Sequence, residues 1–140
     1  MPDSCQSPPA LQRGGRIWGP AAQLYGVRSG RNWGIGDFTD LATLVGLWAE
    51  QGADVVGVNP LHALFPHEPR HASPYSPSSR LFLDTLYLDV EAIADLGECE
   101  EALALIASAP FQSHPAELRN SELVDYVSVA PSQSQIFELL

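Results

Sequence analysis

The segment HASPYSPSSRLF, residues 71–82, has side chains that could hold a flat, hydroxylated ligand. Two prolines flank Tyr75, and each of them holds the serine before it, Ser73 or Ser76, in an extended conformation. A ring restrained in this way loses little entropy when it packs against a sugar or another flat molecule. The alternative is an ordinary surface loop in which Tyr75 only fills a gap.

Several donors near this segment could bind hydroxyl groups as well. His62 follows a predicted strand and is a candidate for hydrogen bonding to a hydroxylated ligand, or else a loop histidine satisfied by the backbone. Arginine side chains are forked donors that can bind hydroxyls, but they more often pair with acids. The candidate arginines are Arg28, Arg31 and Arg80, and the candidate acids are Asp37 and Asp84.

Other kinds of chemistry have little support. His67 and His71 are four residues apart, but the prolines between them forbid a helix, and no carboxylate or cysteine completes a metal site, so no metal is expected. The segment GIGDF lacks the third glycine of a dinucleotide fingerprint, and the chain has no lysine for a phosphate loop. Helix capping explains Asp37 better than catalysis does.

These side chains need a scaffold, and the sequence predicts a β-α-β unit. Residues 21–27 and 55–58 are short apolar runs that predict buried strands. Between them, Asp37 can cap a helix that has Asp40 in its first turn and Gly52 as its stop. The expected apolar face of this helix consists of Leu41, Leu44, Val45 and Trp48.

Ligands bind beyond the carboxyl ends of parallel strands, and this edge should hold the candidate residues. The edge comprises residues 28–36 after the first strand and residues 59–80 after the second, which include His62 and Tyr75. The geometry therefore favours Tyr75 on the ligand-binding face.

The sequence predicts that the second half of the chain is mostly helical. Residues 86–90 predict a short strand, and residues 97–108 predict a helix with Leu103 and Ile106 inward. Further helices should follow up to Pro131, and the final IFELL predicts the start of another amphipathic helix. Residues 1–16, rich in Pro, Gly, Ser and Gln, predict a flexible tail before a domain over residues 17–140.

Composition limits the class of protein. The chain has 140 residues, of which 45% are hydrophobic, enough for one domain but short of the roughly 250 residues of a whole (β/α)8 barrel. A net charge of -10 argues against nucleic acid and anionic membranes as partners. Two cysteines and the absence of a long apolar run predict a cytoplasmic protein.

Three segments together resemble one family: QLYGVRSGRNWGIGDFTDL, GADVVGVNPLHALFP and ASPYSPSSRLFLDTLYLDV. They are similar to bacterial 4-alpha-glucanotransferases, also called amylomaltases or disproportionating enzymes, of glycoside hydrolase family 77 and the alpha-amylase clan. The resemblance implies an α/β fold, a partial (β/α)8 TIM barrel with the first β-α-β unit and the start of an inserted, mostly helical subdomain. The implied activity is transfer of α-1,4-glucan segments to an acceptor sugar.

The resemblance also implies roles for single residues. Tyr75 matches a tyrosine that stacks on the sugar next to the scissile bond, and Ser73 matches a serine that lines the cleft. His62 and Asn59 would be secondary polar contacts or supports. Where relatives usually have Asn-Pro, this chain has Asp84 and Thr85.

In such relatives an aspartate nucleophile, a glutamic acid/base and a second aspartate come from strands beyond Leu140. We therefore expect an incomplete portion of a catalytic domain, assign no catalytic residue, expect no cofactor, and expect the isolated chain to be inactive. The expected partners are α-1,4-glucans, with self-association through the open barrel edge. The alternatives are a non-catalytic carbohydrate-binding or interaction remnant and a hydrolase of the same clan.

Overall fold

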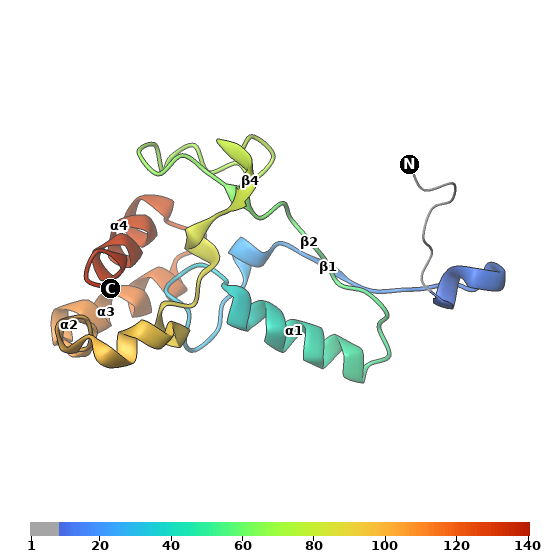
Figure 1. The fold of residues 1–140 in the computed structure, drawn as a ribbon, viewed down its shortest axis with the longest axis horizontal. Helices are drawn as coiled ribbons and strands as arrows, with labels where there is room; N and C mark the ends of the chain where they lie inside the picture. The colour runs from blue at the N-terminus through green and yellow to red at the C-terminus, as the bar shows by residue number, and fades with distance from the viewer. Residues whose placement is uncertain (1–8) are drawn as a thin grey trace.

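A computed structural model describes residues 9–140 as an elongated molecule (Figure 1). Helix α1 and the strands β1 and β2 lie in the middle, the β3–β4 hairpin lies above them, and α2, α3 and α4 gather at one end (Figure 1). The strands are β1 (Ala21–Ala22), β2 (Gly57–Val58), β3 (His62–Ala63) and β4 (Ser79–Leu83). The α-helices are α1 (Phe38–Glu50), α2 (Glu100–Ala107), α3 (Ala109–Asn120) and α4 (Tyr126–Phe137).

The predicted β-α-β unit is present, although its strands are shorter than expected. Strand β1 pairs with β2 in parallel, with Ala21 opposite Gly57, and α1 connects the two. After Ala22 the chain turns into a 3-10 helix, Leu24–Gly26, because the Leu24 N–H bonds to a side chain instead of continuing the ladder. The prediction of a strand over residues 21–27 was therefore too long.

The second strand differs from its prediction in burial. Val55 lies outside β2 and is 47% exposed, and Val58 inside it is 37% exposed. Both side chains are thus partly open to solvent, and within the described residues β2 pairs only with β1. A fully buried strand over residues 55–58 was the wrong prediction.

Helix α1 begins and ends where the sequence predicts. Asp37 Oδ1 accepts from the Asp40 N–H at 2.8 Å and Asp40 Oδ2 accepts from the Asp37 N–H at 3.1 Å, which forms a reciprocal capping box. Gly52 follows the last turn with a φ of 81°, a left-handed conformation that glycine adopts without strain. Both predicted ends are confirmed.

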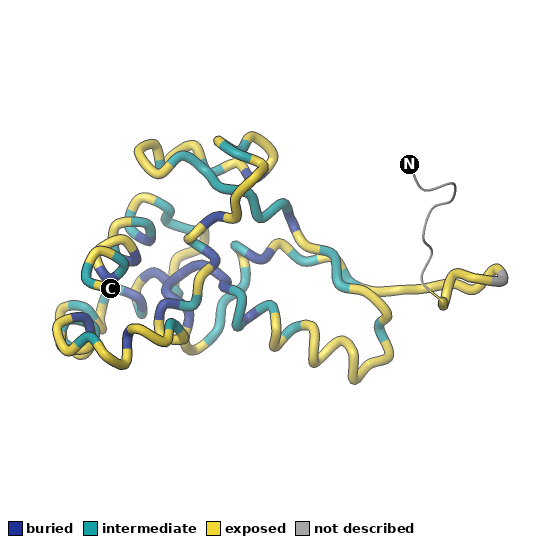
Figure 2. Tube along the Cα trace, viewed as in Figure 1, coloured by how far each residue is buried: buried dark blue, intermediate teal, exposed yellow. Residues whose placement is uncertain are grey.

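Only the first turns of α1 pack against the rest of the molecule. Phe38 and Leu41 contact the first core cluster, whereas Val45 and Trp48 are 45% and 37% exposed. Figure 2 shows this change from buried to exposed along the helix. The predicted apolar face is therefore covered at one end only.

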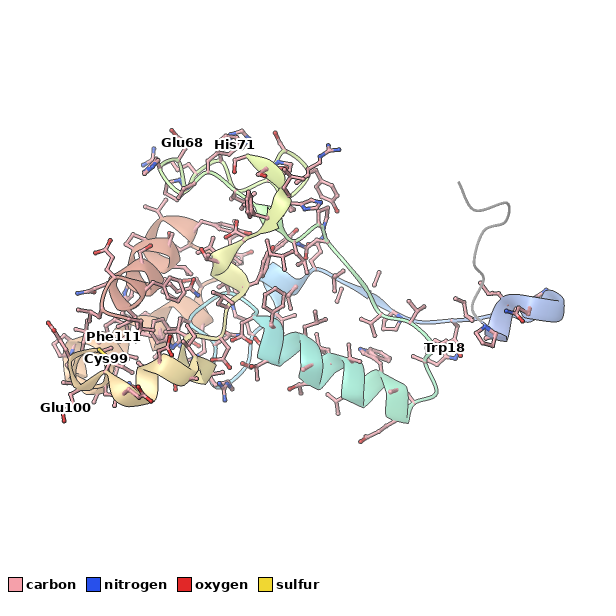
Figure 3. All side chains as sticks on the ribbon, viewed as in Figure 1. Trp18, Glu68, His71, Cys99, Glu100 and Phe111 are labelled. Atoms are coloured by element: carbon pink, nitrogen blue, oxygen red, sulfur yellow. The ribbon has the colours of Figure 1, made fainter. Side chains whose placement is uncertain are left out.

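Two buried clusters pack residues 24–35 against the second half of the chain. The first consists of Leu24, Ile35, Tyr87, Leu118 and Val129, and the second of Trp33, Val90, Leu96, Ala102 and Ile136. Phe111 packs edge-on against Trp33 with ring centroids 5.0 Å apart, and it lies in the helical end labelled in Figure 3. Gly34 passes so close to α3 that a Cβ there would lie 2.5 Å from Leu118 Cβ.

The helical end corrects several details. Residues 86–90 are not a strand: the chain forms 3-10 turns at Thr85–Tyr87 and Val90–Ala92, and a third 3-10 helix, Ala94–Glu98, leads into α2. In α2, Ile106 packs inward as predicted, but Leu103 is 43% exposed and Ala102 is the buried residue.

The last helix also differs from its prediction. Pro131 lies inside α4 and does not end it, although a proline removes one intrahelical N–H and crowds the preceding turn. The terminal IFELL contains the last turn of α4 and its cap at Glu138, not the start of a new helix.

The predicted tail, residues 1–16, lies partly outside the described residues. Its described part contains an exposed 3-10 helix, Pro9–Gly14, so the flexible tail and the domain over residues 17–140 stay predictions. Within residues 9–140, no helix has the length and apolar character needed to cross a bilayer.

Candidate functional site

Tyr75 lies in a tight turn that exposes its ring. The Ser76 N–H donates to the Ser73 carbonyl at 3.1 Å, which closes a turn with Pro74 at its second position, where proline is favoured. Pro74 is buried, whereas Tyr75 is 68% exposed. The short turn holds the ring out toward solvent. This agrees with the expectation that the two flanking prolines restrain Tyr75.

The β3–β4 hairpin carries this turn, and hydrogen bonds close its base. The Ser78 N–H and hydroxyl both donate to the Ala63 carbonyl, at 2.9 and 3.0 Å, and the Asp84 N–H donates to the Leu61 carbonyl at 2.9 Å. The antiparallel register is irregular, because the neighbours His62 and Ala63 pair with Leu83 and Ser79. The residues between Ser79 and Leu83 therefore bulge out of the ladder.

A hollow of about 250 Å³ lies beside the exposed ring. It is lined by Pro60, His62, Pro74, Tyr75, Pro77 and Arg80. Three prolines give it stiff walls, while a phenol, an imidazole and a guanidinium supply polar atoms. The hollow thus combines apolar walls with three side chains that can form hydrogen bonds.

The structure brings together two of the four predicted binding residues. Tyr75 and His62 line the hollow, and His62 is half-buried on β3. Ser73 is exposed and lies one residue before the lining, and its carbonyl closes the Tyr75 turn. Asn59 is only 6% exposed. It directly precedes the lining residue Pro60 in the sequence but does not line the hollow itself.

Asn59 is a buried support whose amide has a partner on each side. Its Oδ1 accepts from the Leu24 N–H at 2.7 Å, and its Nδ2 donates to the Pro60 carbonyl at 2.8 Å and to Tyr87 Oη at 3.0 Å. One side chain thus ties the end of β1 to the end of β2 and to the 3-10 turn after β4. This geometry favours the support role for Asn59 over a ligand contact.

Asp84 anchors the hairpin from below. Its Oδ2 accepts from the Leu64 N–H at 2.8 Å and its Oδ1 accepts from the Leu86 N–H at 2.9 Å. A carboxylate has two acceptor oxygens, so it can satisfy both amides, whereas an asparagine side chain has one acceptor oxygen. The aspartate at this position therefore suits the local geometry.

Burial keeps two tyrosines near this anchor neutral. Desolvation raises the pKa of Tyr87 above its ordinary value of 10.0, although the hydrogen bond from Asn59 partly opposes the change. Desolvation also raises the pKa of Tyr126, with nearby Tyr87 adding to the effect. Both phenols therefore remain protonated across the physiological pH range.

The Asp37 carboxylate lies in the helix cap and does not line the hollow. Desolvation raises its pKa above 3.8, the Asp40 N–H lowers it, and the nearby Asp40 and Asp89 carboxylates raise it. Asn32 Nδ2 also donates to Asp40 Oδ2 at 2.7 Å. The structure thus supports the capping role that the sequence favours for Asp37.

Two of the three candidate arginines are used internally, but not with the expected acids. Arg31 forms an ion pair with Asp89, and Arg28 Nη1 donates to the Tyr25 and Val27 carbonyls at 3.2 Å. Asp37 and Asp84, the expected partners, bind backbone N–H groups. Arg80 is exposed on the lining of the hollow.

A second hollow, of about 240 Å³, lies between the hairpin and α4. Its lining includes Phe65, His71, Leu86, Tyr126 and Ala130. The rings of Phe65 and His71 are stacked with centroids 4.6 Å apart, and Figure 3 places His71 on the outer loop of the hairpin. Within residues 9–140, no three His, Cys, Asp or Glu side chains are grouped as a metal would require.

The anchor residues are the ones that sequence reasoning missed. Asp84 was considered as an arginine partner, and Tyr87 was placed in a strand. Their contacts join Asp84 to Leu64, 20 positions back along the chain, and Tyr87 to Asn59, 28 positions back. One sequence signal was available for Asp84: an aspartate often forms a turn by accepting a hydrogen bond from the N–H two residues later, here that of Leu86.

Comparison with known proteins gives a consistent result. Residues 22–140 match the 4-alpha-glucanotransferase family, glycoside hydrolase family 77. The chain is 45% identical over 128 residues to a 4-alpha-glucanotransferase of Haemophilus influenzae, covering 91% of this chain and 18% of that protein. It is 54% identical over 91 residues to a 4-alpha-glucanotransferase of Mycobacterium tuberculosis, covering 59% of this chain and 12% of that protein.

A solved structure agrees with the sequence matches. The crystal structure of amylomaltase from Corynebacterium glutamicum superposes with a TM-score of 0.72 at 35% identity, over 86% of this chain and 18% of that one. The chain thus spans less than a fifth of the length of these relatives. The match over residues 22–140 shows that the chain belongs to the 4-alpha-glucanotransferase family.

Proposed function

We propose that this chain is the N-terminal barrel portion of a 4-alpha-glucanotransferase, which transfers α-1,4-glucan segments from a donor to an acceptor sugar. The family match, the relatives' names and the amylomaltase structure support this reading. In this proposal β1, α1 and β2 are the first β-α-β unit of a (β/α)8 barrel, and α2, α3 and α4 belong to an inserted helical subdomain.

The observation that carries the proposal is the exposed ring of Tyr75 above a hollow between prolines. A glucose unit has an apolar C–H face that packs on an aromatic ring, and the turn orders that ring before the ligand arrives. The ordering cost of binding is therefore small. His62 supplies a hydrogen-bonding group at the same hollow, Ser73 lies beside it, and Asn59 supports it from below.

Calorimetry with maltoheptaose tests the binding half of the proposal. We expect Tyr75→Ala to weaken binding about tenfold, equal to about 1.4 kcal/mol, because the sugar loses its stacking surface. Tyr75→Phe keeps the ring and should bind like the original chain, and far-UV circular dichroism checks that all variants fold. No binding by the folded original chain, or equal binding by Tyr75→Ala, would refute the proposal.

Catalysis is not assigned to any described carboxylate. Retaining transfer between glucans requires two carboxyl groups about 5–5.5 Å apart across the scissile bond. Asp37 and Asp40 lie close together but are buried in the helix cap. We expect the 140-residue chain to leave maltotriose unchanged, and chromatography that detected longer and shorter maltodextrins would contradict this.

Self-association is proposed for the isolated chain as well. Large apolar side chains are exposed on α1 and near β2, and the strands of the small sheet keep open edges. We expect sedimentation velocity to show a larger species as concentration rises, and a single monomeric species at all concentrations would contradict it. A cytoplasmic location fits the free thiol of Cys99 and can be checked by cell fractionation.

A further inference from the structure

We propose that Arg80 is a specificity-determining residue, whose guanidinium donates to two neighbouring hydroxyl groups of the glucose unit that stacks on Tyr75. This inference rests on the proposed function and assigns a second binding element to the same hollow. Arg80 lines the hollow together with Tyr75 and His62. Arg80 lies on β4, and Tyr75 lies in the turn that precedes β4.

The bulge in β4 explains why Arg80 points at the hollow. In a regular antiparallel hairpin, each residue of β4 would face a partner on β3 and its side chain would alternate between the two faces. Here Ser79 and Leu83 pair with adjacent residues of β3, so Arg80 is released from the ladder. Bulges of this kind re-aim side chains next to binding sites.

Arg80 also differs from the arginines that support the fold. Arg28 and Arg31 have internal partners, and Arg119 Nη1 donates to the Asn32 carbonyl at 2.8 Å. The Arg80 side chain is exposed and forms no hydrogen bond or ion pair with any residue from 9 to 140. Its N–H donors are therefore available to a ligand.

The chemistry of the guanidinium matches an α-1,4-linked glucose. A planar fork with parallel N–H donors can bind two acceptor oxygens at once, and a glucose unit within the glucan has free neighbouring hydroxyls at C2 and C3. A ring beneath the sugar and a fork at its edge would fix both its plane and its rotation. Tyr75 alone fixes only the plane, so Arg80 adds selectivity for the sugar's hydroxyl pattern.

Calorimetry on the 140-residue chain tests the assignment, with maltotriose and its 2-deoxy and 3-deoxy analogues as probes. We expect Arg80→Ala to weaken maltotriose binding about tenfold or more, the usual size for a hydrogen bond to a charged donor. Arg80→Lys should be weakened as well, because a lysine lacks the fork. Arg70→Ala removes the same charge from an exposed site off the lining and should leave binding unchanged.

The deoxy sugars separate recognition from a general charge effect. The original chain should bind at least one deoxy analogue more weakly than maltotriose, whereas Arg80→Ala should bind the three sugars alike. If Tyr75→Ala loses affinity but Arg80→Ala does not, the Arg80 assignment is wrong and the proposed function survives. If the folded original chain binds no maltotriose, the proposed function fails and the assignment fails with it.

Discussion

Two groups of polar side chains lie near the end of β2, and they differ in what their atoms bind. The buried group, Asn59, Asp84 and Tyr87, has partners in the backbone or within the group. The rim group, His62, Tyr75 and Arg80, lines the open hollow, and no hydrogen bond to its side chains is formed within the described residues. The two groups therefore differ in hydrogen bonding: the buried side chains are paired within the protein, and the rim side chains are not paired within the described residues.

The comparison has an energetic consequence. Removing a member of the buried group leaves an unpaired polar group inside the protein, which costs far more than removing an exposed side chain. Removing a member of the rim group should leave stability unchanged and affect only binding. Measurements of the free energy of unfolding on single variants therefore test this division.

The largest effect is expected for Asn59→Ala. The change leaves the Leu24 N–H and the Tyr87 hydroxyl without their partner in a buried site, so the free energy of unfolding should fall by about 2–5 kcal/mol. Urea denaturation followed by circular dichroism measures it. Ser73→Ala, on the exposed turn, is the control and should change stability by about 0.5 kcal/mol or less. Similar losses in the free energy of unfolding for both variants would contradict the proposed support role of Asn59.

A smaller loss is expected for Asp84→Asn. The amide can accept from only one of the two backbone N–H groups, so the free energy of unfolding should fall by about 1–3 kcal/mol. Hydrogen exchange should speed up at Leu64 or Leu86, which shows which contact is lost. Unchanged protection at both amides would remove Asp84 from the buried group.

The helix cap provides a pH-dependent test on a third buried site. The pKa of Asp37 is raised in the folded state, so the folded protein binds this proton more tightly than the unfolded chain does. Ionised Asp37 therefore lowers stability as the pH rises from 3.8 through the raised folded pKa, and below 3.8 the penalty is absent. Asp37→Asn keeps a capping oxygen but does not ionise, so it should lose this part of the pH dependence.

Melting temperatures measured against pH for both chains check this expectation. The difference between them should move in favour of Asp37→Asn over that pH range. Asp37→Ala removes the cap itself and should cost about 0.5–2 kcal/mol at every pH. Parallel curves for the original chain and Asp37→Asn would show that Asp37 does not carry the predicted linkage.

The smallest stability effects are expected in the rim group. Tyr75→Ala and Arg80→Ala should each change the free energy of unfolding by about 0.5 kcal/mol or less, since both side chains are exposed. The same urea titrations measure them. A loss comparable to that of Asn59→Ala would mean that the rim group supports the fold.

Local signals in the sequence were sufficient for some elements. The Asp37 cap, with Asp40 in the first turn, and the Gly52 stop were predicted because each depends on residues within one turn of the helix. The restraint around Tyr75 was predicted for the same reason, since proline restricts its own residue and the one before it, whereas the turn itself came from the structure. The parallel pairing of β1 and β2 followed from the β-α-β order.

Features that depend on distant contacts could not be predicted. The end of β1 is set by Asn59, which lies 35 residues from Leu24, and the partner of Arg31 is 58 residues away at Asp89. Burial was overestimated for Val55 and Val58, because an apolar run reports hydrophobicity and not whether another element covers it. The site residues in the rim group came from composition and resemblance, and their shared hollow came from the structure.

The irregular register of β4 separates the ends of the hairpin from its middle. Because Ser79 and Leu83 carry the pairing with β3, the residues between them can change in number while both ends of the ladder stay in place. One inserted or deleted residue there would move Arg80 relative to Tyr75, which lies in the turn before β4. Under the proposed assignment, the length of this segment would set the distance between the Arg80 guanidinium and the Tyr75 ring while the hairpin ends remain constant.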